Sequence, residues 1–493
     1  MTKSELQIAL HDRTALVKKV VGVGAAVRFT HLQMIMAVFI LAAVFYTVVF
    51  EANGWLTVGR AFVALSTTMY LVMWIYSIIV VTISTNDAVI EVTDEDVQNS
   101  TRDRWPYLSV MVAIYNEAAM VPYLVANMKQ LEYPDWDHQV IFVVEERDRE
   151  TIDALLAQML PSNFSIVIRP HKHPSKKTKP GAIMYAIRDA NALDPKSQLF
   201  VIYDAEDNPP SDQLKKAVIA YERVRKQHPH VRCVQGMLAF ANSKENWLAR
   251  LFSLDYANHF RLMLPGLAKA GLLAPLGGTT NFIDTQVIKD LGYDEANVTE
   301  DLDLAVKMWL AGIGTRVFSS TTMEEAVTHP RPWIRQRSRW IKGAMQTAAV
   351  YARHPLFILR MKGLKGLLSI FITLGGSIFS PLISPIFWGL TAIYALTGAE
   401  FVQQLYPGAL FHLASISFFF GNFTFVYFVL LAAMHTKQYS NVFFAVLAPF
   451  YWVLMSVAAY VAAQEFFSPK LHMWQKTEHK GAASTKKVEE LAA

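Results

Sequence analysis

Long uncharged apolar runs lie near the start of the chain and in its last third, whereas the middle has the mixed pattern of a water-soluble domain. The first two runs are Leu32 to Phe50 and Ala61 to Ile83. Each has the roughly 20 residues that a helix needs to cross a bilayer. A charge at the centre of such a helix costs about 2.5–3.5 kcal/mol, so its absence favours two membrane-spanning helices that form a hairpin.

The last third contains three further apolar runs. Leu367 to Leu396 is uncharged, is longer than one span needs and is interrupted by two prolines, so we expect two short helices or one span plus a re-entrant piece. Ala409 to Met434 and Val442 to Ala463 are expected to be single spans. The tail from Lys470 is basic, which favours the cytoplasmic side and an even number of crossings after the middle domain; three crossings would place it outside.

The middle of the chain predicts an α/β domain. Short segments that are apolar at every position alternate with amphipathic segments, which is typical of a mostly parallel sheet with helices on both faces. Glu117, Glu146 and Asp204 each follow the end of an expected strand. Because ligands of such sheets bind at the carboxyl ends of the strands, we expect these acids to converge on one crevice. The expected strands are residues 107–114, 140–144, 165–168, 199–203 and 232–236.

These patterns divide the chain into four parts. Residues 1–90 are a basic, membrane-facing lead and the first hairpin, and residues 91–350 are the α/β domain, which ends in basic amphipathic helices at the membrane surface. Residues 351–468 form the second membrane region, and residues 469–493 are the tail. The lead begins with basic amphipathic sequence and has no cleavable signal-peptide pattern.

Composition supports a membrane protein and excludes some classes. Hydrophobic residues make up 53% of the 493 residues and charged residues 18%, which is apolar for a soluble protein. A net charge of +5 is too small to indicate nucleic-acid binding. The single cysteine, Cys233, excludes an intrachain disulfide and a cysteine-based zinc site.

The strongest candidate for chemistry is the acidic segment that follows the strand at 199–203. Asp204, Glu206 and Asp207 come directly after it, and Pro209 prevents the strand from continuing. Carboxylates that crowd together repel one another unless a cation compensates them, and Mg²⁺ or Mn²⁺ prefers one or two carboxylates plus substrate phosphates. A solvated acidic turn is the alternative.

Two later motifs have similar alternatives when each is taken alone. Thr299-Glu300-Asp301 opens a helix with Thr299 as its cap, where acids also stabilise the helix dipole. Gln336-Arg337-Ser338-Arg339-Trp340 lies on a basic helix that could simply rest on a membrane surface.

Together, in this order and spacing, the three motifs resemble the membrane-embedded family 2 glycosyltransferases, which include the cellulose, hyaluronan and poly-N-acetylglucosamine synthases. The Asp-Ala-Glu-Asp variant at 204–207 is similar to exopolysaccharide synthases of the phage N4 adsorption protein B type. The resemblance implies a GT-A fold set between the two membrane regions and a cytoplasmic catalytic domain on a multi-pass inner-membrane protein. It further implies inverting, metal-dependent transfer from a nucleotide sugar, expected to be a UDP-sugar.

The resemblance also assigns roles to residues. Asp301, with Glu300, is expected to be catalytic as the base for the acceptor hydroxyl. The metal, Mg²⁺ or Mn²⁺, is expected on Asp204, Glu206 and Asp207. The nucleotide-binding residues are expected to be Tyr115, Asn116, Glu117, Glu146, Lys179, Arg337 and Arg339, with Glu145 as the alternative to Glu146. The acceptor-binding residues are expected to be Trp340, Gln336, Gly278, Thr279, Asn281 and Thr299.

Three functions remain open at this stage. The first is a synthase that extends a polysaccharide and passes it across the membrane. The second adds one or a few sugars to a lipid acceptor with the same catalytic residues. The third is a non-enzymatic membrane subunit. Expected partners of the enzyme are the nucleotide-sugar donor, a growing glycan or lipid acceptor, the bilayer, and export or regulatory subunits, but no nucleic acid.

Overall fold

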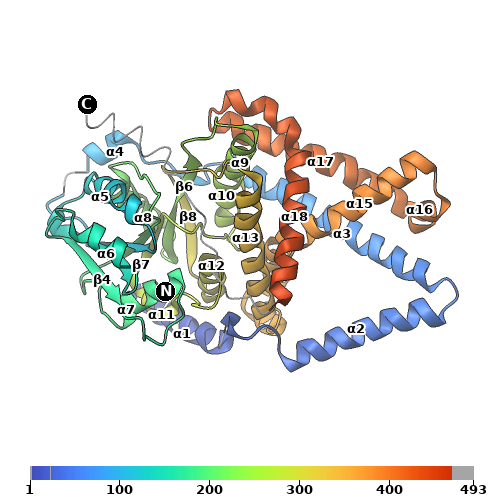
Figure 1. The fold of residues 1–493 in the computed structure, drawn as a ribbon, viewed down its shortest axis with the longest axis horizontal. Helices are drawn as coiled ribbons and strands as arrows, with labels where there is room; N and C mark the ends of the chain where they lie inside the picture. The colour runs from blue at the N-terminus through green and yellow to red at the C-terminus, as the bar shows by residue number, and fades with distance from the viewer. Residues whose placement is uncertain (1–2, 23, 101, 469–493) are drawn as a thin grey trace.

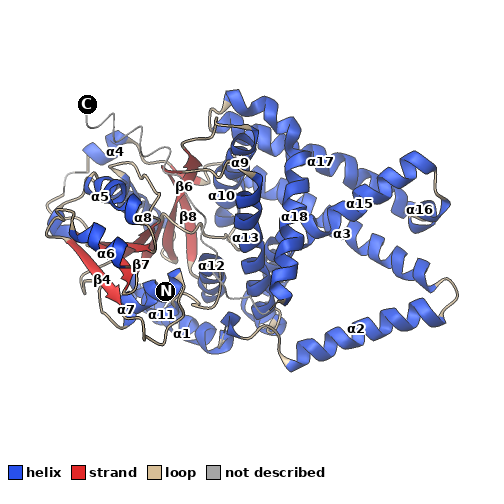
Figure 2. Ribbon diagram, viewed as in Figure 1, coloured by secondary structure: helices blue, strands red, loops and turns tan. Residues whose placement is uncertain are grey.

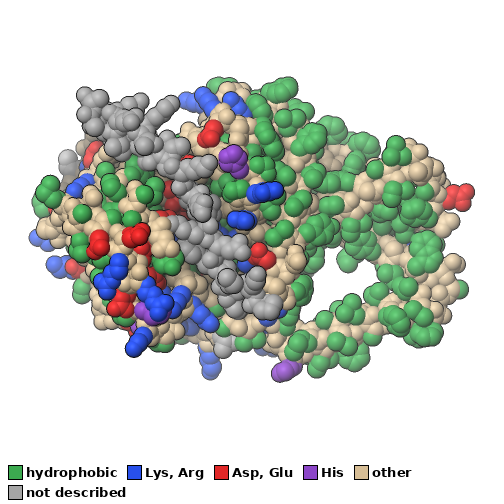
Figure 3. All heavy atoms as spheres, in the orientation of Figure 1, with side chains coloured by type: hydrophobic (Ala, Val, Ile, Leu, Met, Phe, Trp, Pro, Cys, Tyr) green, Lys and Arg blue, Asp and Glu red, His purple; other side chains and the backbone are tan. Residues whose placement is uncertain are grey.

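A sheet domain and a group of apolar helices that extend away from it make up the fold (Figure 1). The structure is a computed structural model, and it describes residues 3–22, 24–100 and 102–468. The basic tail, residues 469–493, lies outside the described residues. Hydrophobic side chains cover the extended helices, and charged side chains gather on the sheet domain (Figure 3).

The domain contains one sheet of eight strands in the order β1-β8-β6-β7-β5-β2-β3-β4. All pairings are parallel except those of β7, which runs antiparallel to β5 and β6. The five expected strands are confirmed, and β1, β7 and β8 were not predicted. The strands are β1 Val89–Ile90, β2 Leu108–Ile114, β3 His138–Glu145, β4 Phe164–Arg169, β5 Leu199–Tyr203, β6 Val231–Phe240, β7 Asn281–Asp284 and β8 Gly314–Glu324.

Both faces of the sheet are buried, which explains why its strands are apolar at nearly every position. On β2, Met111 belongs to one hydrophobic core, and its neighbours Val110 and Val112 belong to the other. Successive side chains of a strand point to opposite faces, so each face needs its own layer of helices. Those helices are α5 Val121–Lys129, α6 Arg149–Leu156, α7 Lys179–Arg188, α8 Gln213–Gln227, α11 Thr285–Leu291 and α12 Glu300–Ala311 (Figure 2).

The amino-terminal lead packs on the sheet domain. Its helix α1, Lys3–Val21, lies against α11 and α12, and the short turn η1, Gly24–Ala26, follows it. Val17 of α1 is fully buried in the same hydrophobic core as Met111. The domain therefore covers one side of α1, whereas Ile8 and Leu16 of the same helix remain exposed.

The first two apolar runs form the expected hairpin. Helix α2, His31–Phe50, contains no buried residue. Helix α3, Gly54–Ser84, packs along α10, Leu264–Lys269, and α17, Ala409–His435. In Figure 1, α2 diverges from the other extended helices and meets α3 at the tip of the hairpin. Both helices are long and apolar enough to cross a membrane.

The long run after the domain is one continuous helical segment, which corrects the expected break. After a kink at Gly363 (φ 66°), α14 (Pro355–Ile370) continues through the π-helical turn η5 (Phe371–Gly375) into α15, Gly376–Thr397. Pro381 and Pro385 lie inside α15 without ending it. A proline removes one backbone hydrogen bond, which a helix in an apolar setting can accommodate locally. The chain then turns through α16, Glu400–Leu405, and returns along α17, Ala409–His435.

The last apolar run does not lead away from the domain. Helix α18, Ala448–Phe467, follows the short segment η6, Tyr439–Leu447, and lies along α13, Pro330–Tyr351 (Figure 1). Near its start, Tyr451 accepts a hydrogen bond from Arg337 of α13 at 2.8 Å. At its end, Arg28 binds the carbonyl oxygens of Phe467 and Ser468 at 3.1 and 2.6 Å. After the domain the chain thus goes out along α15 and back along α17, and the last apolar segment, Tyr439–Phe467, is itself long and apolar enough to cross a membrane.

The contact of α18 with α13 predicts a stability effect. Lys342 of α13 is 2% exposed and pairs with Glu465 of α18 at 2.7 Å. Removing one partner of a buried ion pair costs about 3–5 kcal/mol. Glu465 is 23% exposed, so we expect Glu465→Ala to lower the free energy of unfolding in detergent by about 3 kcal/mol. The control Glu400→Ala, at an exposed position of α16, is expected to change it by less than about 0.5 kcal/mol; equal effects would contradict this account of α18.

Candidate active site

A cavity of about 1130 Å³ begins at the carboxyl ends of the central strands and continues between the apolar helices. On the domain side it is lined by residues that follow β2 and β5 and by the first turn of α12. On the other side it reaches Met73 of α3, Pro381 of α15 and Phe425 of α17. One cavity therefore joins the acidic strand ends to the apolar region.

The acidic segment after β5 divides into two roles. Asp204 and Glu206 line the cavity. Asp207 does not: it is fully buried, and its Oδ2 accepts hydrogen bonds from the Asp204 amide at 2.7 Å and from the Thr279 hydroxyl. Burial and the nearby carboxylates raise the pKa of Asp207 well above its usual value. We expected Asp207 among the metal ligands. In this structure it instead fixes the acidic segment against the turn that contains Gly277 and Gly278, here called the glycine turn.

Lys179 balances the charge of this acidic segment. It opens α7, and its Nζ binds Asp204 Oδ1. Burial would lower the pKa of Lys179, but Asp204 and then Glu300 outweigh burial and raise it. The lysine thus holds a full positive charge between the segment after β5 and the start of α12.

The two acids at the start of α12 face the same cavity. Asp301 Oδ1 accepts a hydrogen bond from the Leu302 amide at 2.8 Å. Burial raises the pKa of Asp301, and burial together with Asp301 raises the pKa of Glu300 to about 7. A carboxylate with a raised pKa is the form that general base catalysis near neutral pH uses. A Cβ built on Gly278 would lie 3.6 Å from Asp301 Oδ2, so the glycine turn passes directly beside this acid.

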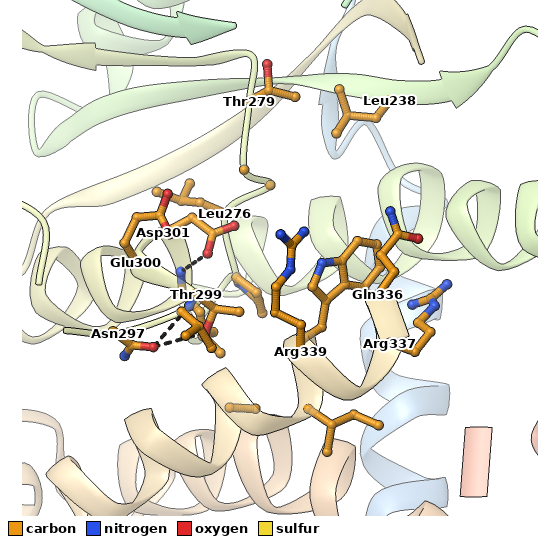
Figure 4. Close-up of a pocket in the computed structure, with 18 of the residues that line it drawn as sticks. Leu238, Leu276, Thr279, Asn297, Thr299, Glu300, Asp301, Gln336, Arg337 and Arg339 are labelled. Carbon is orange, nitrogen blue, oxygen red and sulfur yellow. Dashed lines mark hydrogen bonds between the residues drawn. The ribbon is translucent and has the colours of Figure 1, made fainter. Parts of the chain in front are cut away.

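Helix α13 brings its polar residues to the opposite wall of the cavity. Gln336, Arg339 and Trp340 all line it, and the guanidinium of Arg339 points toward the Asp301 side in Figure 4. The side-chain oxygen of Gln336 is buried and has no hydrogen-bond partner among the described residues. This wall therefore offers a cation, an aromatic ring and an amide to whatever enters beside Asp301.

Arg337, which we expected to bind phosphate, lines the same cavity, and its guanidinium is engaged by protein side chains. It pairs with Asp255 at 2.6 Å and with Tyr451, and its guanidinium lies 4.5 Å from the ring centroid of Trp340. Figure 4 shows it on the side of α13 that is remote from Asp301. In the structure Arg337 holds the tryptophan and α18 in place, and both Arg337 and Arg339 line the cavity.

The expected nucleotide-contacting residues are only partly brought together. Tyr115 and Glu117 line the cavity, whereas Asn116 and Glu146 do not. Asn116 adopts a left-handed turn (φ 52°), and Glu146 accepts a hydrogen bond from the His171 amide at 2.8 Å. Glu145, which is paired with Arg169, lines the cavity in place of Glu146.

The expected acceptor-binding set shows a similar division. Gly278, Thr279 and Thr299 line the cavity. Asn281 lies in β7 and donates a hydrogen bond to the Gly277 carbonyl, so it stabilises the glycine turn from behind.

Sequence reasoning missed several cavity residues. Glu324 ends β8 and lies near Asp207, Glu206 and Asp204; burial and these acids raise its pKa. His259 lies in the π-helical segment η4, Asn258–Met263, between α9 (Trp247–Ala257) and α10 (Leu264–Lys269). No local sequence pattern marks either residue as part of a cavity. Glu324 ends a strand that was not predicted, and His259 lies inside an amphipathic helical segment.

Asp204 and Glu206 alone are too few to hold a divalent cation, and a bound ligand would have to supply further oxygen atoms. No group of three or more His, Cys, Asp or Glu side chains that could hold a metal ion occurs in residues 3–22, 24–100 and 102–468. Asp204 and Glu206 supply two carboxylates, of which Asp204 is paired with Lys179. Oxygen ligands of this kind suit Mg²⁺ or Mn²⁺ when phosphates complete the coordination.

Comparison with known sequences agrees with this geometry. Residues 106–343 match the family described as Glycosyltransferase like family 2. The chain is 26% identical over 258 residues to a beta-monoglucosyldiacylglycerol synthase of Trichormus variabilis, which covers 50% of this chain and 51% of that protein. It is 22% identical over 240 residues to the probable glycosyltransferase YdaM of Bacillus subtilis, covering 48% and 55%. The chain spans about half the length of these curated relatives.

A solved structure shows the same fold. The mannosyltransferase PcManGT from Pyrobaculum calidifontis, in complex with GDP-Man and Mn²⁺, superposes with a TM-score of 0.51 at 16% identity, over 84% of this chain and 99% of that chain. The sheet domain is therefore a GT-A-like mixed α/β domain, and the match of residues 106–343 to the glycosyltransferase family 2 model agrees with the expected resemblance. The relatives named above do not support the finer likeness to polysaccharide synthases.

The approach of α13 to the acid loop predicts an effect on activity. A Cβ on Gly343 would overlap Thr299, which precedes Glu300 and Asp301. Gly343→Ala is expected to push α13 away and to lower the turnover number at least about tenfold, because misplacing a reacting group by about 1 Å costs up to 10²-fold. The control Gly389→Ala places its Cβ in open space on α15 and is expected to leave turnover unchanged. Equal turnover for the two variants would show that this contact is dispensable.

Proposed function

We propose that the protein is an inverting glycosyltransferase that moves a sugar from a nucleotide diphosphate sugar to a hydroxyl of an acceptor held in the membrane. The cavity that joins Asp301 to the apolar helices is the observation that carries this proposal. It supports a donor site and an acceptor site that meet at one acid. The apolar helices support a multi-pass membrane protein, and we propose that the sheet domain lies on the cytoplasmic face.

The donor half of the cavity suits a nucleotide diphosphate. Tyr115, Glu117 and Glu145 lie at its outer end, where they can contact the base and ribose. Asp204 and Glu206 would hold a divalent cation, which when bound offsets the charge of the departing diphosphate. Arg339 can bind phosphate oxygens as a planar fork, and Lys179 adds a second positive charge.

The acceptor half supports a single displacement. Asp301 takes the proton of the acceptor hydroxyl as that oxygen attacks the anomeric carbon, and the bond from that carbon to the diphosphate breaks. One displacement inverts the configuration. Trp340 offers a flat face to a sugar ring or a headgroup, and Gln336 offers its unpaired oxygen to a hydroxyl.

A lipid-linked acceptor is the first candidate. The cavity runs past Leu238, Met263, Phe425 and Met455 on its way between the helices, and these side chains suit an acyl or polyprenyl chain. The relative from Trichormus variabilis is named as a synthase of beta-monoglucosyldiacylglycerol, which supports a lipid acceptor.

Extension of a polysaccharide is the second candidate. A volume of about 1130 Å³ exceeds what one nucleotide sugar and one headgroup require, and the cavity continues beyond Trp340 to Pro381. These two observations favour a longer glycan in the same site.

The size of the product tests the proposal and separates the two acceptors. Purified protein in lipid vesicles would receive radiolabelled UDP-glucose, UDP-N-acetylglucosamine and GDP-mannose in turn. We expect labelled material that migrates as a glycolipid on thin-layer plates, whereas label that stays at the origin would indicate a polymer. Asp301→Asn is expected to lower transfer by about 10²–10⁴-fold while nucleotide binding persists. Normal turnover in Asp301→Asn would remove this acid from the base role.

Metal removal gives a second prediction. Excess EDTA is expected to abolish transfer, and Mn²⁺ or Mg²⁺ is expected to restore it, because the diphosphate needs a cation between it and Asp204. Asp204→Asn should require a higher metal concentration for half-maximal rate than wild type, whereas Asp212→Asn, outside the cavity, should not. Full activity in excess EDTA would refute the metal site.

The pH dependence of turnover gives a third prediction. The base must be deprotonated, so turnover falls as pH falls through the raised pKa of Asp301, and this acidic limb should lie above the ordinary aspartate pKa of about 4. Lys179 lowers the pKa of both Asp301 and Glu300. We therefore expect Lys179→Gln to move the acidic limb up by about one pH unit. Lys215→Gln, outside the cavity, should leave it in place, and a limb that does not move in Lys179→Gln contradicts the assignment.

A further inference from the structure

The loop that precedes the catalytic acid is bound by the amino-terminal lead. Residues 292–298 connect α11 to Thr299, and Asp294 lies near their middle. Asp294 Oδ2 accepts a hydrogen bond from the Ala25 amide of η1 at 2.7 Å, and its Oδ1 accepts one from Ala296 within the loop at 3.0 Å. A single carboxylate therefore ties the lead to the loop and also shapes the loop.

The lead fits against Asp294 so closely that only glycine is allowed at one position. Gly24 has a φ of +55°, and a Cβ there would overlap the Asp294 carboxylate. Arg353, just beyond α13, donates a hydrogen bond to the Gly24 carbonyl at 3.1 Å. The backbone of η1 is thus held on both sides, by the loop and by the end of α13.

The same loop is bound by the two other walls of the active site. On the donor side, the Lys176 amide and the Thr178 hydroxyl bind Glu295, each at 3.0 Å, directly before Lys179. On the side of α13, the Val298 amide donates to Gln346 at 3.0 Å. Three elements of the molecule therefore meet on the few residues that lead into Thr299, Glu300 and Asp301.

We infer that the Ala25–Asp294 contact is a positioning contact for Asp301, so that the lead sets the place of the catalytic base although it touches no substrate. This inference rests on the proposed function. Asp294 and η1 lie outside the lining of the active-site cavity, so the contact acts on the base only through the loop. Since η1 runs on through Arg28 into α2, the position of the first apolar helix is connected to the base by the six residues of backbone between Asp294 and Asp301.

A positioning contact has a kinetic signature that a merely stabilising contact lacks. Most of the proposed donor site is built by residues after β2, β3 and β5, and the loop reaches Lys179 only through the contacts of Glu295, which Asp294 does not make. Loosening the loop should therefore lower the turnover number and leave the KM for the donor unchanged. Displacement of a reacting group by about 1 Å costs up to 10²-fold in rate, which sets the size of the expected loss.

Two glycines of the lead provide a matched pair of variants. Gly22 has a φ of +59°, nearly that of Gly24, but a Cβ there would lie 4.0 Å from its nearest neighbour, the Val20 carbonyl. Gly22→Ala and Gly24→Ala therefore introduce the same backbone strain, and only Gly24→Ala displaces Asp294. The full-length protein in vesicles would be assayed with whichever donor of the panel the wild type uses.

We expect Gly24→Ala to lower kcat about 10–100-fold relative to Gly22→Ala, with the donor KM within about twofold of wild type. The double variant Gly24→Ala/Asp294→Ala should be no slower than Asp294→Ala alone, because both changes act on one contact.

The inference is overturned if both single variants keep the same kcat, if Gly24→Ala lowers only the thermal unfolding temperature, or if the two changes are additive. A wild-type protein that transfers no sugar from any donor would instead refute the proposed function itself.

Discussion

The main constraint on this active-site cavity is that its many buried carboxylates need compensating positive charge. Asp204, Glu206, Glu300, Asp301 and Glu324 all line it, and Asp207 lies just behind. Like charges this close cannot all remain ionised without a compensating cation, and burial increases the repulsion. Lys179 supplies part of that compensation through Asp204 and Glu300. The remaining imbalance is what makes the cavity a place for a cation and a polyanionic ligand.

The fold brings these acids together from distant parts of the sequence. Parallel strands place their carboxyl ends at one edge, so β2, β3 and β5 deliver their following residues to the same place. The two antiparallel pairings of β7 return the glycine turn to that edge, where Thr279 binds Asp207. Helix α13 then closes the other side, and α18 holds α13 through Tyr451 and Glu465. The acceptor wall is thus secured by the last apolar run of the chain.

Much of this was open to prediction from the sequence, because the signals are local. Apolar strands followed by acids identified β2, β3, β5 and the cavity edge, and uncharged runs identified α2, α3 and α17. The errors arise where tertiary contacts decide. Nothing local shows that Arg337 pairs with Asp255, because only the fold brings the two side chains together. An apolar run of spanning length also could not reveal that α18 lies along α13, because Lys342 and Arg28 act from other parts of the chain.

The central claim is that separated acids and α13 form one cation-dependent nucleotide-sugar site. A structure determined with UDP and Mn²⁺, in which the metal is located by its anomalous scattering, tests it most directly. The account predicts a manganese peak beside Asp204 and Glu206, with the diphosphate in the same cavity as Asp301 and Arg339. A metal bound elsewhere, or a nucleotide outside this cavity, would contradict it.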